Sequence, residues 1–189
     1  MDKLIVVYDS CVLYSAPLRD LLMHLAMTDL FRAKWSEDIH EEWTRNVLKN
    51  RTDLTKEQLK RTRDLMDSYV RDCLVKGYET LIEKITLPDQ NDRHVLAAAI
   101  HSSASVIVTY NLKDFPSNET LKYGIEAQHP DEFISKFLEY ASGIIRGAIK
   151  RLRSTLKNPP IVAEKYLEIL AGQSLPKTVS KLREFISLI

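Results

Sequence analysis

The chain has 189 residues, of which 44% are hydrophobic and 28% are charged, as in an ordinary globular protein of one domain with an appendage. No apolar stretch approaches the roughly 20 residues that a transmembrane helix needs, and Asp2-Lys3 leads into a short strand instead of a signal peptide. The composition therefore excludes a membrane protein and favours a cytoplasmic one. Two cysteines, Cys11 and Cys73, argue against a disulfide framework.

The net charge of +1 hides an asymmetry along the chain. Residues 1–142 hold 18 Lys and Arg against 23 Asp and Glu, a balance of −5, whereas residues 143–189 hold 9 against 3, a balance of +6. A basic segment after an acidic body indicates contact with nucleic acid, with an acidic partner or with the body itself. A solvated basic helix face is the simplest alternative.

In the first half of the chain, apolar runs alternate with amphipathic ones. Leu4–Tyr8 is apolar and β-branched, as in a strand buried on both faces. Pro17 fits the first turn of a helix, Ser36 fits a helix N-cap, and Gly77 fits a helix end. We expect, in chain order, a strand at 4–8, a helix from 16 to about 30, a strand at 31–35, a helix at 37–50 and a long helix at 55–76.

The alternation continues to about residue 140. We expect a strand at 85–87, a helix at 91–102, strands at 106–110 and 125–128, and a helix at 130–140. Alternating strands and helices predict a mainly parallel sheet with helices on both faces, a three-layer α/β/α fold. After residue 142 only helices are expected, separated by Asn158-Pro159-Pro160 and Leu175-Pro176. We therefore divide the chain into a domain at 1–142 and a basic helical extension at 143–189.

Polar side chains follow two of the expected strands. Asp9 ends the first strand, and Asn111 ends the strand at 106–110 with Asp114 close behind. The carboxyl ends of parallel strands meet at one edge of a sheet, where ligands of such folds bind. We expect these three side chains to lie near one another.

Two further carboxylates lie on the expected helices. Glu42 borders the buried stripe marked by Ile39 and Trp43, and Asp92 lies in the first turn of the helix at 91–102. Taken singly, Asp9 could be a cap, Glu42 a solvated acid and Asp92 a partner of the helix dipole. Clustered together, such carboxylates repel unless a cation lies between them, and oxygen ligands suit Mg²⁺ or Mn²⁺.

Four stretches of the chain resemble the motifs of a known protein family. The most specific is the block from Val106 to Pro116, with Asn111 and Asp114 after the strand. The others run from Val6 to Leu13, from Trp35 to Trp43, and from Leu87 to Asp92 with Ala97–Ala99. Over about residues 3–140 the chain resembles a PIN-domain ribonuclease of the VapC toxin type.

The resemblance implies a PIN-like fold and Mg²⁺- or Mn²⁺-dependent cleavage of RNA, often tRNA or another structured RNA. It also implies an antitoxin partner and a homodimer. Asp9, Glu42 and Asp92 would be the metal ligands, Asn111 and Asp114 would complete the catalytic set, and Ser10 would support the site beside the first aspartate. The chain departs from the family pattern with Cys11, where many members have Asn, and with Asn111, where many have Asp.

An acidic pocket needs flanking cations to hold RNA. Arg93 lies next to Asp92, and Lys113 lies in the loop after the strand. Arg146, Lys150 and Arg153 share one face of a helix in the basic extension. The long helix at 55–76 offers further cations, namely Lys56, Lys60, Arg61 and Arg63.

Other functions remain open from the residues alone. A PIN nuclease that processes RNA without an antitoxin would carry the same acids. A catalytically weak PIN-fold module that only binds RNA is the alternative from another class, and Asn111 is the one residue in its favour. A phosphohydrolase with an aspartate nucleophile usually has a second Asp two residues later, where this chain has Cys11.

Overall fold

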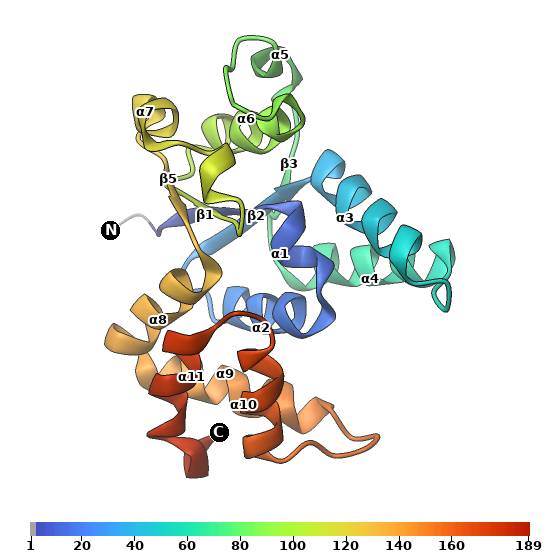
Figure 1. The fold of residues 1–189 in the computed structure, drawn as a ribbon, viewed down its shortest axis with the longest axis vertical. Coiled ribbons are helices and arrows are strands. Elements are labelled where there is room, and N and C mark those ends of the chain that lie inside the picture. Colours follow the sequence, from blue (N-terminus) through green and yellow to red (C-terminus); the bar gives the residue numbers. More distant parts are fainter. Residues whose placement is uncertain (1–2) are drawn as a thin grey trace.

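The computed structural model describes residues 3–189 and contains one five-stranded parallel sheet in the order β3-β2-β1-β4-β5 (Figure 1). Register pairs Val6 of the central strand with Ala33 on one side and with Val106 on the other. The strands are β1 (Ile5–Tyr8), β2 (Arg32–Ser36), β3 (Leu74–Val75), β4 (Val106–Val108) and β5 (Glu126–Gln128). The predicted three-layer α/β/α fold with a C-terminal helical extension is confirmed.

Helices cover both faces of the sheet and continue beyond it. Ser36 caps α3 by accepting a hydrogen bond from the backbone N–H of Ile39, and Thr55 forms a capping box with Gln58 at the start of α4. The α-helices are α1 (Ser10–Tyr14), α2 (Ala16–Ala26), α3 (Glu37–Asn50), α4 (Lys56–Tyr69), α5 (Glu79–Ile82), α6 (Arg93–His101), α7 (Ser117–Thr120), α8 (Pro130–Tyr140), α9 (Ser142–Thr155), α10 (Ala163–Ala171) and α11 (Pro176–Arg183). Short 3₁₀ segments are η1 (Gln90–Asp92), η2 (Leu112–Asp114), η3 (Leu121–Tyr123) and η4 (Ile186–Leu188).

The expected boundaries were wrong in four places. The strand expected at 85–87 is absent from the described residues, and β3 lies earlier because Trp35 donates its backbone N–H to the carbonyl of Cys73 and so extends the sheet there. Helix α4 therefore ends at Tyr69 instead of residue 76, and the chain turns through Asp72 at φ 56°. Helix α2 ends at Ala26 because the chain turns through Asp29 at φ 60°. Helix α1 was not expected; the Asp9 carboxylate caps it.

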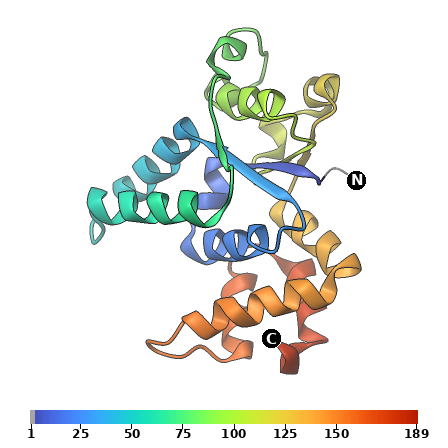
Figure 2. The ribbon, with the colours of Figure 1, turned by 180° about the vertical axis from the view of Figure 1, so that it is seen from behind.

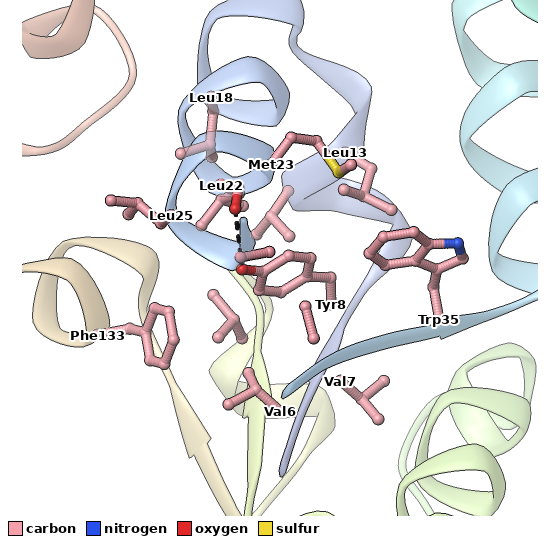
Figure 3. Packing of buried hydrophobic residues seen from close by; sticks show 14 of the residues in the cluster. Val6, Val7, Tyr8, Leu13, Leu18, Leu22, Met23, Leu25, Trp35 and Phe133 are labelled. Atoms are coloured by element: carbon pink, nitrogen blue, oxygen red, sulfur yellow. Dashed lines mark hydrogen bonds between the residues drawn. The ribbon is translucent and has the colours of Figure 1, made fainter. Parts of the chain in front are cut away.

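The central strand is buried on both faces, as its sequence predicts. Val6, Val7 and Tyr8 are fully buried. The hydroxyl of Tyr8 donates a hydrogen bond of 3.2 Å to the carbonyl of Leu22 on α2, and its ring stacks on Trp35 at a centroid distance of 6.2 Å (Figure 3). Helix α6 packs against β1, β2 and β4 and lies above the sheet in Figure 1, with α2 below it. The sheet is therefore held rigidly between α6 and α2.

The C-terminal helices pack against the sheet domain through α2 and α8 (Figure 2). Helices α9 and α10 contact α2, and α11 contacts α8. The buried carboxylate of Asp131 on α8 accepts hydrogen bonds from the backbone N–H groups of Lys177 and Thr178, at 2.9 and 2.8 Å, in the first turn of α11. Because Leu175 at the N-cap position gives no side-chain cap, Asp131 takes that role from another helix. No helix among residues 3–189 is long and apolar enough to cross a bilayer.

Candidate active site

Asp9 lies directly after β1, at the carboxyl edge of the sheet, and is 1% exposed. One carboxylate oxygen accepts the backbone N–H of Ser10 at 2.6 Å, and the other accepts the hydroxyl of Thr109 at 2.6 Å and the thiol of Cys11 at 3.1 Å. Burial raises the pKa of Asp9, and the hydrogen bonds from Thr109 and Cys11 oppose that rise. These donors fix the carboxylate in one orientation.

Glu42 lies in the second turn of α3 and is partly buried, with 23% of its side chain exposed. Its Oε2 is 3.1 Å from Nε2 of His94 on α6. Burial acts to raise the pKa of Glu42, but hydrogen bonds from His94 and Ser10 bring it below its ordinary value. Glu42 is therefore an ionised carboxylate held at the contact between α3 and α6.

Asp92 lies between η1 and α6 and is 7% exposed. Among residues 3–189, no group donates a hydrogen bond to its carboxylate. Burial, together with the negative charges of Asp9, Asp89, Glu42 and Asp114, raises the pKa of Asp92 to about 7. An acid that is buried, unpartnered and surrounded by other acids needs a positive charge to remain ionised.

The loop after β4 brings the remaining expected residues to the same edge. Asp114 is half-buried at the end of η2, and its charge reaches Asp92. Asn111 is exposed, and its backbone N–H donates to the hydroxyl of Thr109 at 2.9 Å. Ser10 is buried at the start of α1 and hydrogen-bonds to Glu42. The structure thus brings the acids of the predicted set to one edge of the sheet.

The cations that are expected to bind the substrate do not all lie next to the site carboxylates. Arg93 follows Asp92 and donates to the carbonyl and side-chain oxygens of Gln90. Lys113 is exposed in η2, next to Asp114. Both residues flank the carboxylates directly.

The cations of the basic extension have other surroundings. The guanidinium of Arg146 lies over the ring of Phe185 at 4.3 Å, and that of Arg153 donates to the carbonyls of Ile161 and Ile189 at 2.9 and 2.8 Å. Lys150 is exposed on α9, a helix that packs against α2 and α8. Two of these three cations are thus tied into the helical extension.

Sequence reasoning missed three groups that hold the carboxylates in place. His94 is 52 positions from Glu42 in the chain, and Thr109 is 100 positions from Asp9, so no local pattern reveals either pairing. Cys11 hydrogen-bonds to Asp9, and its sulfur accepts the backbone N–H of Tyr110 at 3.3 Å. The departure from the family pattern at position 11 therefore still supplies a donor to the first aspartate.

The chemistry of the donor set fits a divalent cation. Within residues 3–189, no three His, Cys, Asp or Glu side chains lie close enough together to bind one ion as they stand. The set nevertheless consists of carboxylate oxygens from four elements, which suit Mg²⁺ or Mn²⁺. Asp92 is the residue that points most directly to a cation, because a positive charge beside it would offset both the burial and the repulsion that raise its pKa to about 7.

Comparison with known protein families identifies the family of this chain. Residues 5–113 match the PIN domain. The chain belongs to the PIN domain family. Residues 130–184 match a second family, described as the VapC50 C-terminal domain, so the helical extension also has relatives. No solved structure gives a significant match.

A curated protein is also similar to this chain. Over 107 residues, 57% of this chain, the PIN protein is 36% identical to "Putative ribonuclease VapC50" of Mycobacterium tuberculosis. The aligned part covers 62% of that relative, less than two thirds of its length. Over the aligned part, the chain is therefore similar to a putative VapC ribonuclease.

Proposed function

We propose that the chain is a metal-dependent endoribonuclease and the toxin of a VapBC-type toxin–antitoxin pair. The observation that carries the proposal is the set of carboxylates Asp9, Glu42, Asp92 and Asp114 at the carboxyl edge of a PIN-domain sheet, in which Asp92 receives no hydrogen bond from the described residues. The name of the mycobacterial relative supports a ribonuclease. RNA is the substrate class, and tRNA or rRNA is the first target to test.

Asp9, Glu42 and Asp92 would hold Mg²⁺ or Mn²⁺. The bound ion would activate a water for attack on a phosphodiester and would neutralise charge that develops on the phosphate oxygens. Asp9 is already oriented by Thr109 and Cys11. Shared ligation requires the three carboxylates to move closer together, because they do not meet as they stand.

The groups after β4 would complete the site. Asp114 adds negative charge beside Asp92, and the amide of Asn111 is free to orient a water or the substrate, since its side chain is exposed. Ser10 would hold Glu42 in place. Arg93 and Lys113 would contact the phosphates that flank the scissile bond. The binding of RNA by Arg146, Lys150 and Arg153 stays a prediction.

The partners are part of the proposal. The family resemblance implies an antitoxin and a homodimer. An apolar groove of about 400 Å³ between α2 and α4 offers a surface for the apolar face of an antitoxin helix, because Met27, Leu65 and Tyr69 are exposed along it.

Cleavage of a total tRNA and rRNA pool tests the proposal. The purified chain and its Asp92→Asn variant are compared with Mn²⁺, with Mg²⁺ and with EDTA. Discrete cuts that disappear with EDTA and with the substitution are the expected result. Folded parent protein, freed of any bound antitoxin, that cuts no RNA under these conditions would instead support the RNA-binding module.

A further inference from the structure

One face of α3 carries both a carboxylate of the site and two cations. Arg45 and Lys49 follow Glu42 by three and seven residues, so all three side chains lie on the same face of the helix. The cations are displaced along the helix axis from Glu42 by about 4.5 and 10.5 Å. Arg45 is close enough to Glu42 for their charges to interact. A row of positive charge therefore begins next to Glu42 and continues along α3.

These two cations are exposed and available. Neither Arg45 nor Lys49 forms an ion pair with any of residues 3–189. Both line a groove of about 1070 Å³ between α3 and α4. Among the other charges that line this groove, Arg63 binds Glu37 and Lys60 binds Asp64, whereas Lys56, Glu41 and Glu57 form no ion pair with the described residues. The unpaired cations Arg45, Lys49 and Lys56 thus outnumber the two unpaired acids and attract an anionic ligand.

The acids of α3 do not cancel this row. Glu37 is paired with Arg63, and Asp38, which accepts the hydroxyl of Tyr78 at 2.7 Å, lies in the first turn of α3, before Glu42. Glu41 alone remains exposed without an ion pair among the described residues. The exposed face after Glu42 is therefore net positive.

We propose that the face of α3 marked by Arg45 and Lys49 binds the phosphates next to the scissile bond and leads the RNA strand away from the site carboxylates. This inference rests on the proposed ribonuclease function and deepens it by assigning the path of the substrate. Arg45 and Lys49 lie about one and two helical turns beyond Glu42, so a strand that leaves the carboxylates along this face passes both side chains. The backbone alone is contacted, so this face contributes affinity without sequence preference.

The expected effect follows from the release of counterions. Each phosphate contact on a single strand contributes about 0.7 to the slope of log K against log salt concentration. Removal of both cations is expected to lower that slope by about 1.4, which corresponds to a loss of affinity of about 25-fold at about 0.1 M salt.

The experiment measures binding separately from cleavage. All variants are made in the full chain with Asp92→Asn, and the binding of fluorescein-labelled oligouridine and of total tRNA is titrated by anisotropy in EDTA over a range of salt. Arg45→Ala with Lys49→Ala is the test pair. Arg45→Lys with Lys49→Arg keeps the charge, and Arg151→Ala with Lys157→Ala removes two exposed cations from the helical extension.

The inference predicts weaker binding and a smaller slope for the test pair only. Binding unchanged in the test pair, or lowered equally by the Arg151 and Lys157 pair, would overturn it. A Lys150→Ala variant that loses affinity while the test pair does not would place the RNA on the extension instead. Because binding is read without cleavage, a parent protein that cuts no RNA refutes the proposed function but leaves the test of this face intact.

Discussion

Nε2 of His94 lies 3.1 Å from Oε2 of Glu42, and this contact joins the first turn of α6 to the second turn of α3 beside the site carboxylates. His94 lies two residues after Asp92. The same segment therefore carries one candidate metal ligand, Asp92, and the residue that orients another, Glu42. Partners that orient ligand side chains commonly alter metal affinity by 10- to 100-fold when they are lost.

We predict that His94→Phe weakens Mn²⁺ binding by about 10-fold, because Glu42 loses the donor that fixes it. Isothermal titration with Mn²⁺ measures the effect, and circular dichroism checks the fold. His94→Gln, which retains an N–H donor, should bind Mn²⁺ nearly as well as the parent. Equal affinity in His94→Phe and parent would show that the contact does not position Glu42.

The Asp92 carboxylate should destabilise the metal-free protein at neutral pH. Its pKa in the folded protein is about 7, above the ordinary value of 3.8, because it is buried among other acids. Above pH 7 the carboxylate is charged in both the folded and the unfolded protein, so the folded state is destabilised by the full cost of holding this charge among other acids. As the pH falls toward 4 the folded protein takes up the proton and the cost disappears.

Asp92→Asn is therefore expected to raise the free energy of unfolding by about 1–3 kcal/mol at pH 8 in EDTA, and much less at pH 5. Urea unfolding at both pH values measures the difference. Asp89→Asn removes only one of the charges that raise the pKa of Asp92 and should therefore give a smaller gain at pH 8. A gain of the same size at both pH values would contradict this explanation.

Thr109 orients Asp9 across two neighbouring strands. Its hydroxyl donates to Asp9 at 2.6 Å and accepts the backbone N–H of Asn111 at 2.9 Å. Thr109→Val leaves both groups without this partner and is expected to cost about 1–3 kcal/mol of stability. Thr109→Ser keeps the hydroxyl and should retain most of both stability and cleavage. Thermal unfolding and the RNA cleavage assay distinguish the two variants.

Asp131 should anchor the helical extension. Its carboxylate accepts two backbone N–H groups at the start of α11 from within α8. Asp131→Ala is expected to cost about 1–2 kcal/mol, as the loss of a helix cap does, and to raise hydrogen exchange in residues 176–183. Asp131→Asn keeps one acceptor oxygen and should lose less. Exchange that stays unchanged in α11 would show that its packing, and not this cap, holds the helix.

The sequence predicted much of this protein through local patterns. The apolar run at Leu4–Tyr8 identified a strand buried on both faces, and Ser36 and Pro130 marked helices that begin where expected. The parallel sheet follows from the alternation of strands with helices, and the edge that gathers Asp9 and Asp114 follows from the parallel sheet.

Only the tertiary structure decided how the site is held together. The pairings of His94 with Glu42 and of Thr109 with Asp9 join residues that are far apart in the chain. Likewise, β3 is too short to have a pattern of its own and exists because β2 offers it a hydrogen-bonding edge. Local propensity and periodicity act over a few residues, whereas burial, charge repulsion at Asp92 and contacts between helices depend on which segments meet in space.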